Sequence, residues 1–333
     1  MRIFAKPPSK NYLVQLMASH DDGNFLTGIA SAFLRLVKSN NGGRFLNQTY
    51  KFRSALFGHT SVNQNLIRGL QSLNAEVKFN SKLKNSSQSI GVLAGSYALK
   101  KIISKSVSTT VVAGPNFYSD EPLLLNPKVK LSLVPSNWVI NMINNSNLYE
   151  KTRVWAVGVD TEFWKPIKNR KNLNEVRHGL IYVKSNSAEI SSLQKSIMNL
   201  SGFKWSLIRY GAYRRIEFKR LLSEVDFCIY LGSSESQGLA QFECWSMDIP
   251  TFVFDCQRDI TVQLKITTVK LRANQYSVAP YLNSATGSLW HDMTELETLI
   301  NYSKPERFTP RIWIKENATL SISAKEYLKH LRS

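Results

Sequence analysis

The chain has 333 residues, a length that suits two domains of ordinary size better than one compact core. Hydrophobic residues make up 43% and charged residues 20%, so the chain can bury a core, which excludes a disordered tail and a low-complexity filament. Lysine and arginine number 43 against 24 aspartate and glutamate residues, which gives a net charge of +19. This balance predicts an anionic partner such as nucleic acid, a phosphorylated substrate or a membrane surface.

Positive charge is concentrated in the first third of the chain. Residues 1–110 hold 15 basic and three acidic side chains, an excess of 12 positive charges. The three cysteines are an odd number without close spacing, which argues against a disulfide framework or a zinc site and suits a reducing cytosol. The first residues lack the apolar core of a signal peptide, and the apolar runs are too short to span a membrane. We therefore expect a cytoplasmic protein, peripheral at most on the inner face of a membrane.

The first half of the chain alternates helical patterns with short apolar runs, as proteins with parallel sheets do. Residues 10–50 do not fit this alternation and are expected to form a helical, basic insertion. Its apolar face at 25–38 indicates a core helix, with a membrane-bound amphipathic helix as the alternative. A helix is expected at 61–73, and Ser136 is expected to cap a helix that follows it. Strands are expected at 76–80, 89–95, 109–114 and 130–135.

The second half repeats the alternation after a connecting segment, residues 154–176. The expected strands are 179–184, 205–211, 226–232 and 250–255, and the expected helices are 190–200, 215–225 and 239–247. A last helix is expected over 311–333. Two consecutive α/β series predict an α/β fold of two Rossmann-like domains, 1–165 and 166–333, which face each other across a cleft.

The segment 231–255 carries the most chemical information. A strand leads into a polar turn with Gly238, and a helix begins at Leu239. Glycine lets a ligand approach the backbone, and the free N–H groups at a helix start bind anions, so this turn is a candidate phosphate site. Glu235 and Glu243 are expected to face the same site, where carboxylates bind hydroxyl groups. Phosphates and vicinal hydroxyls together indicate a nucleotide-sugar; the alternative is that Glu235 caps the helix and Glu243 lies in solvent.

The spacing of Glu235 and Glu243 within SESQGLAQFE resembles the E-x7-E signature of retaining glycosyltransferases of the family 4 type, in particular of a bacterial and viral subgroup. Further segments are similar in the same order, namely GHTSVNQNLIRGL, VVAGPNF, LVPSNWV and WAVGVDTEFWKP. The resemblance covers about residues 55–330. It implies the GT-B fold, with two Rossmann-like domains, and a hexosyltransferase-type enzyme that transfers a sugar from a nucleotide-diphosphate-sugar with retention of configuration.

The resemblance also implies roles for individual residues of this motif. Glu243 would bind the ribose hydroxyls of the donor. Glu235, the catalytic candidate, would contact the transferred sugar. The backbone amides of Gly238 and Leu239 would meet the diphosphate or the sugar.

Two basic residues are further donor-binding candidates. Lys184 stands where the family presents a basic residue after the first strand of the second domain. A second lysine, usual in relatives, is missing, and Arg209 is the candidate substitute. The alternative for both is ordinary solvated charge. Tyr210 and Tyr213 are candidates to pack on a nucleobase, with core packing as the alternative for at least one of them.

The acceptor-side candidates lie in the first domain. Gly58 and His59 are expected at the start of a helix that faces the cleft, and Asn116 follows a strand end; structural roles are the alternatives for His59 and Asn116. Asp160 is expected to fix the turn between the domains. No metal and no cofactor are expected, in keeping with the lack of an Asp-x-Asp motif or a His/Cys ligand cluster.

The expected partners are a nucleotide-sugar donor and a glycan or lipid-linked acceptor. The excess charge of residues 1–110 is assigned to an anionic acceptor or to an anionic membrane surface that holds it. One alternative is a catalytically inactive scaffold with the GT-B fold. The other is a basic nucleic-acid-binding protein, for which the sequence shows no RNP, helix-turn-helix or zinc-finger pattern, so no nucleic acid is expected.

Overall fold

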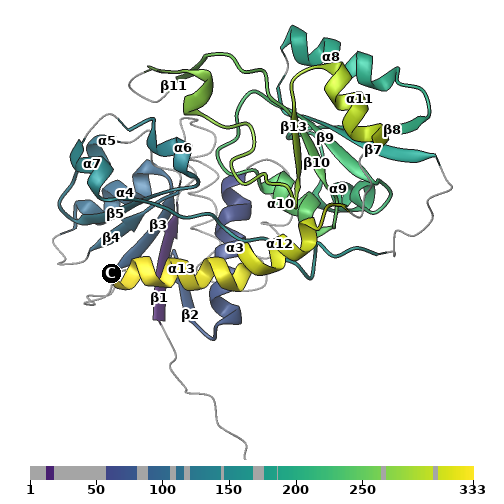
Figure 1. Cartoon of the computed structure of the whole chain (residues 1–333). Coiled ribbons are helices and arrows are strands. Elements are labelled where there is room, and N and C mark those ends of the chain that lie inside the picture. The colour runs from purple at the N-terminus through teal and green to yellow at the C-terminus, as the bar shows by residue number, and fades with distance from the viewer. Residues whose placement is uncertain are drawn as a thin grey trace, which may run out of the picture.

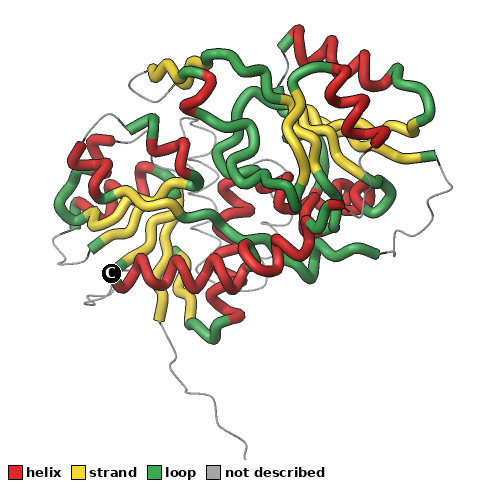
Figure 2. The backbone as a smooth tube through the Cα atoms, in the orientation of Figure 1, coloured by secondary structure: helices red, strands yellow, loops and turns green. Residues whose placement is uncertain are grey.

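The computed structural model describes residues 13–18, 58–80, 89–105, 110–115, 121–143, 146–167, 176–185, 187–263, 268–302 and 307–333. The described chain forms two parallel β-sheets, each with helices on both faces (Figure 1, Figure 2). The strands of the first sheet end at residue 154, and those of the second begin at residue 177. The expected domain boundary at 165/166 lies between the two sheets and stays a prediction.

The first sheet has six parallel strands in the order β2-β1-β3-β4-β5-β6. They are β1 (Leu13–Ala18), β2 (Glu76–Phe79), β3 (Ile90–Ala94), β4 (Val111–Ala113), β5 (Val129–Val134) and β6 (Thr152–Val154). β3 and β4 are buried along their whole length. Both of their faces are covered, which explains why the sequence shows continuous apolar runs there and no polar alternation. The strands expected from β2 to β5 are confirmed.

Helices cover both faces of the first sheet. On one face, Leu66 and Leu70 pack in one core with Ala324 and Tyr327 from the C-terminal helix. On the other face, a second core includes Leu99. The helices are α3 (Gly58–Ser72) and α13 (Leu320–Arg332) on the first face, and α4 (Ser96–Ile103), α5 (Glu121–Leu124) and α7 (Ser146–Glu150) on the second. The helix expected at 61–73 is confirmed as α3.

The second sheet has five parallel strands in the order β13-β10-β9-β7-β8. They are β7 (Arg177–Val183), β8 (Phe203–Arg209), β9 (Phe227–Leu231), β10 (Thr251–Phe254) and β13 (Gly287–Trp290). One face is covered by α8 (Ala188–Met198) and α11 (Met293–Tyr302), the other by α9 (Arg215–Leu222), α10 (Leu239–Ser246) and α12 (Pro310–Asn317). The strands and helices expected from 179 to 255 are confirmed.

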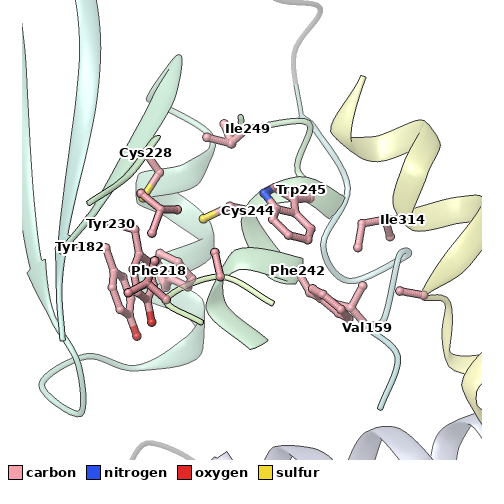
Figure 3. Close-up of a cluster of buried hydrophobic side chains, with 14 of the residues drawn as sticks. Val159, Tyr182, Phe218, Cys228, Tyr230, Phe242, Cys244, Trp245, Ile249 and Ile314 are labelled. Atoms are coloured by element: carbon pink, nitrogen blue, oxygen red, sulfur yellow. The ribbon is translucent and has the colours of Figure 1, made fainter. Parts of the chain in front are cut away.

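The largest apolar core joins the two halves. It holds Phe218 and Phe242 of the second half (Figure 3) together with Val134 and Val139 of the first. The short helix α6 (Asn137–Ile140) carries Val139. An antiparallel hairpin of β11 (Ile260–Gln263) and β12 (Thr268–Leu271), followed by the 3-10 turn η1 (Ala273–Gln275), packs on the same core. The two halves therefore share buried apolar surface and are not independent domains joined only by a linker.

The C-terminal segment crosses from the second half back to the first (Figure 1). The sequence predicts one helix over 311–333, whereas the structure has two, α12 and α13, separated at Ala318 and Thr319. The backbone N–H of Val159 donates to the carbonyl oxygen of Ala318 at 2.9 Å, and Val159 forms a parallel bridge with Thr319. The Thr319 hydroxyl then caps α13. The prediction of one helix is wrong because the backbone at the break pairs with the connecting segment.

Two further expectations need correction. Leu13–Ala18 form β1, which lies inside the first sheet, so the helical insertion expected at 10–50 is wrong for these six residues. The strand pairs with β2 and β3 and buries Val14, Leu16 and Met17, which overrides any helical pattern. The helix expected at 25–38 lies outside the described residues. Ser136 precedes α6 but makes no capping hydrogen bond; its hydroxyl donates instead to the carbonyl oxygen of Ser236 in the other half.

We predict that Gly69→Ala destabilises the protein, although glycine-to-alanine changes inside helices ordinarily stabilise by about 0.5–1 kcal/mol. A Cβ atom at Gly69 would lie 2.4 Å from the carbonyl oxygen of Leu320 and 2.9 Å from the Cβ of Ala324, so α3 and α13 would have to separate. The free energy of unfolding, measured with urea, should fall by about 1–3 kcal/mol. Gln71→Ala, at an exposed position of the same helix, should change it by less than about 0.5 kcal/mol. A stabilised Gly69→Ala variant would show that the helices are not in close contact.

Candidate functional site

The candidate site begins at the carboxyl end of β9, in the centre of the second sheet. Residues 232–238 connect this strand to α10, and Gly238 has φ 90° and ψ 50°, the left-handed region that favours glycine. A Cβ atom there would lie 2.5 Å from Oε1 of Gln241. α10 has neither a capping side chain nor an acidic residue in its first turn. The positive end of its dipole is therefore uncompensated within the helix, as an anion site requires.

The 232–238 loop is held by polar groups of the first half. The indole Nε1 of Trp138 donates to the carbonyl oxygen of Glu235 at 2.8 Å, and the Ser136 hydroxyl donates to that of Ser236 at 2.5 Å. Gln237, which is 5% exposed, makes two hydrogen bonds with the backbone of Val157 in the connecting segment. The position of the loop thus depends on both halves of the molecule.

Glu235 is a buried carboxylate with two donors. Its Oε2 accepts from the Lys184 ammonium at 2.7 Å and from the Tyr230 hydroxyl at 2.5 Å. Its side chain is 10% exposed and that of Lys184 25%. The sequence alternative, in which Glu235 caps α10, is wrong for this structure, because α10 has no side-chain cap.

Three tyrosines form a cluster that contacts Glu235 through Tyr230. The rings of Tyr182 and Tyr230 stack with centroids 4.9 Å apart (Figure 3), and the hydroxyls of Tyr182 and Tyr213 are 3.0 Å apart. Burial raises the pKa of Tyr182 far above its usual value, with further contributions from Tyr213 and then from the charges of Glu235 and Glu243. The tyrosines contact Glu235 through the Tyr230 hydroxyl, and Glu243 lies on the helix that follows the same loop.

Glu243 lies on α10 next to a buried arginine. Its side chain is 13% exposed, and its Oε1 is 3.8 Å from Nε of Arg215, the first residue of α9. The Arg215 guanidinium also lies over the rings of Phe163 and Trp164, 4.5 and 5.2 Å from their centroids. Burial raises the pKa of Glu243 to about 7, although the positive charge of Arg215 opposes the shift. The alternative that Glu243 is a solvated surface residue is therefore wrong.

The basic candidates differ in their surroundings. Lys184 follows β7 and pairs with Glu235, so it is part of the cluster. Arg209 ends β8, and its guanidinium is exposed and donates to Oε1 of Gln194 at 2.7 Å. The structure therefore brings Lys184 to the motif, whereas the role of Arg209 toward a diphosphate stays a prediction.

The two tyrosines considered for a nucleobase are also distinct. Tyr213 packs on Phe218 and bonds to the hydroxyl of Tyr182, so it belongs to the core. Tyr210 is 53% exposed, with the Lys184 ammonium 5.7 Å from its ring centroid.

The acceptor-side candidates are described only in part. Gly58 and His59 are the first two residues of α3, as expected, but their side chains lie outside the described residues. Asn116 lies outside them altogether. Asp160 accepts the backbone N–H of Phe163 at 2.9 Å and pairs with Arg68 of α3 at the same distance. It fixes the turn as predicted, and in addition ties the turn to the first half.

The chain is similar to solved structures over nearly its whole length. One is sucrose-phosphate synthase from Thermosynechococcus elongatus, with a TM-score of 0.55 and 10% sequence identity over 97% of this chain and 98% of that one. Another is the apo form of the lipopolysaccharide outer core galactosyltransferase WaaB, with a TM-score of 0.53 and 11% identity over 96% and 98%. The chain has the GT-B fold. The expected fold class is thus confirmed, while identities this low show the fold alone.

Other comparisons add little to this result. A likeness with a TM-score of 0.47 and 10% identity covers 74% of this chain and 52% of a chain of accessory secretory protein 1, 2 and 3 in Streptococcus pneumoniae, so this chain spans about half the length of that protein. No protein-family model matches the chain, and no curated protein matches it in sequence.

Membrane and metal features can be stated for the described ranges. Among the helices described, none combines the length and apolar character that crossing a bilayer requires. Within the same ranges, no three His, Cys, Asp or Glu side chains come together as a metal site would need. The expectation of no metal and no cofactor stays a prediction.

Several residues of the site escaped the sequence analysis. Tyr182 and Tyr230 occupy buried strand positions, where a tyrosine is interpreted as a core residue. The sequence pattern does not show where its hydroxyl points. Arg215, at the start of a helix, and Trp138 did carry a signal, because they lie in segments that resemble the glycosyltransferases, RYGAYRRIEF and LVPSNWV.

We predict that Glu243→Gln stabilises the protein much more at pH 8 than at pH 5. The folded state keeps a proton on Glu243 up to about pH 7, whereas the unfolded chain loses it near pH 4.5, so the wild-type unfolding free energy falls as pH rises between these values. The full effect is on the order of 3 kcal/mol, and glutamine does not titrate. Urea unfolding of both proteins at the two pH values measures it. Glu224→Gln, at an exposed glutamate, is the control; an equal Glu243→Gln effect at pH 5 and pH 8 contradicts the prediction.

Proposed function

We propose that the protein is a glycosyltransferase that moves a sugar from a nucleotide-diphosphate-sugar to a glycan or lipid-linked acceptor with retention of configuration. The observation that carries the proposal is that Lys184 and Tyr230 hold Glu235 in the loop that leads into the uncapped start of α10, and that the same helix carries the buried Glu243. A donor of this class needs groups for an anion and groups for hydroxyls at adjacent places, and this arrangement supplies both. The GT-B fold is consistent with it.

The donor would bind through complementary contacts. The first amides of α10, with Leu239 at its start, and the Lys184 ammonium would hold the diphosphate, whose negative charge grows as the sugar departs. Glu243 would bind the ribose hydroxyls; its raised pKa gives it a proton to donate near neutral pH as well as an oxygen that accepts. Glu235 would accept hydrogen bonds from the transferred sugar.

The stereochemical course is part of the same proposal. With the diphosphate and the sugar proposed on the side of α10, front-face attack by the acceptor would keep the anomeric configuration. Retention, the hexosyltransferase subclass and a reaction without a metal ion are parts of this proposal.

The acceptor is proposed to approach from the first half. Arg68, Lys78, Lys100, Lys101 and Lys105 are the described basic residues of segment 1–110. The positive charge of this half suits an anionic acceptor, such as a lipid-linked phosphate, or an anionic membrane surface that holds it.

We expect one nucleotide-diphosphate-sugar from a panel of uridine, guanosine, adenosine and thymidine donors to raise the melting temperature and to be slowly hydrolysed. Glu243→Ala should abolish this binding, measured by calorimetry, because it removes the ribose contact. Glu224→Ala removes an exposed carboxylate of the same half and should leave the affinity unchanged. NMR of the released sugar or product gives its anomeric configuration.

Two results count against the proposal. Unchanged donor affinity of Glu243→Ala would remove its main support. A wild type that binds no donor but binds DNA or RNA with micromolar affinity or better at physiological salt would favour the nucleic-acid alternative; binding of a donor without any turnover would favour an inactive scaffold.

A further inference from the structure

Two donors of different kinds meet on one oxygen of Glu235. The Lys184 ammonium and the Tyr230 hydroxyl both donate to Oε2, at 2.7 and 2.5 Å. Lys184 is a flexible, partly exposed cation that also reaches the carbonyl oxygen of Ser234 at 3.4 Å. Tyr230 is 2% exposed, so water cannot replace the carboxylate as the hydrogen-bond partner of its hydroxyl. Within the described residues, the hydrogen bonds to the Glu235 carboxylate all fall on Oε2, and Oε1 is left for a ligand.

The Tyr230 ring is fixed from several sides. Tyr182 is its cross-strand partner in the β7–β9 register and stacks on it with an interplanar angle of 10°. Phe218 packs in turn on Tyr182, with centroids 5.7 Å apart. The backbone of Gly232, the first residue after β9, lies close to the same ring, since a Cβ atom added there would come within 3.2 Å of Cε1 of Tyr230. The phenol is thus preorganised by packing and does not depend on the carboxylate for its orientation.

From this geometry we infer that Tyr230 is the positioning residue of Glu235: its buried hydroxyl holds Oε2 and keeps Oε1 directed to the transferred sugar when Lys184 turns to the donor diphosphate. The inference rests on the proposed function for its substrate. Lys184 pairs with Glu235 in the free protein and is proposed to bind the diphosphate of the donor. It therefore has to change partners when the donor binds. Without Tyr230, the carboxylate would lose its remaining donor at that step and be free to rotate.

The first test is Tyr230→Phe, which removes one hydroxyl and keeps the ring. Removal of a hydrogen bond to a charged group corresponds to a factor of about 10 to 100. We expect kcat for sugar transfer or donor hydrolysis to fall by this factor. Affinity for the nucleoside diphosphate without a sugar should stay within about twofold, because that ligand does not touch Glu235. Tyr327→Phe removes the hydroxyl of a buried tyrosine in the core of the first half, away from the candidate glutamates, and should leave kcat within about twofold. If Tyr230 only stabilised the fold, Tyr230→Phe would lower kcat and the affinity for the nucleoside diphosphate together, or would lower neither.

The second test needs no activity. In a crystal structure of Lys184→Met, Glu235 Oε2 should remain in hydrogen-bond distance of the Tyr230 hydroxyl, whereas in Tyr230→Phe the carboxylate should adopt a new rotamer or several. A Glu235 side chain that leaves Tyr230 in Lys184→Met, or stays in place in Tyr230→Phe, overturns the inference.

The two tests also separate the inference from the proposed function. If no donor binds to the wild type but the two crystal structures agree with expectation, the proposed function fails and the holding role of Tyr230 stands. If donors bind and Tyr230→Phe keeps wild-type kcat, the inference fails and the proposed function stands.

Discussion

The 232–238 loop lies between the two halves of the molecule, where its backbone N–H and C=O groups need hydrogen-bond partners. Much of the site follows from this constraint. A buried carbonyl without a donor costs about 1–3 kcal/mol. Trp138 and Ser136 of the first half supply donors to the carbonyls of Glu235 and Ser236, and Gln237 supplies its amide to the connecting segment. Glu235 therefore lies in a loop whose conformation depends on the assembled chain, and Glu243 lies in the helix that follows this loop.

The same assembly gives the two glutamates different chemical characters. Glu235 accepts hydrogen bonds from a cation and a phenol on one oxygen. Glu243 is buried beside an arginine whose Nε is 3.8 Å away, and desolvation outweighs that attraction. Since Arg215 also lies over Phe163 and Trp164, the surroundings of Glu243 include the segment that connects the halves. One carboxylate is thus suited to accept hydrogen bonds and the other to exchange a proton near neutral pH.

Most of the regular structure was predictable, and the failures have local causes. β3, β4 and β9 are short apolar runs bounded by glycine or polar turns, so their strands could be assigned from composition alone. β1 could not, because its six residues lie where the sequence does not show the α/β alternation, and they become a strand only when β2 and β3 pair with them. The break before α13 arises from a backbone bond with Val159, a residue about 160 positions earlier.

The sequence by itself determined the two α/β series, the glycine turn and the glutamate pair around it, because these depend on local periodicity and on the backbone freedom of Gly238. Only the tertiary structure decided what surrounds the glutamates: a phenol and an ammonium on Glu235, a buried guanidinium beside Glu243. The physical reason is that a side chain's position in a strand or helix fixes which face it occupies, whereas its hydrogen-bond partner is set by residues brought close through folding of distant segments.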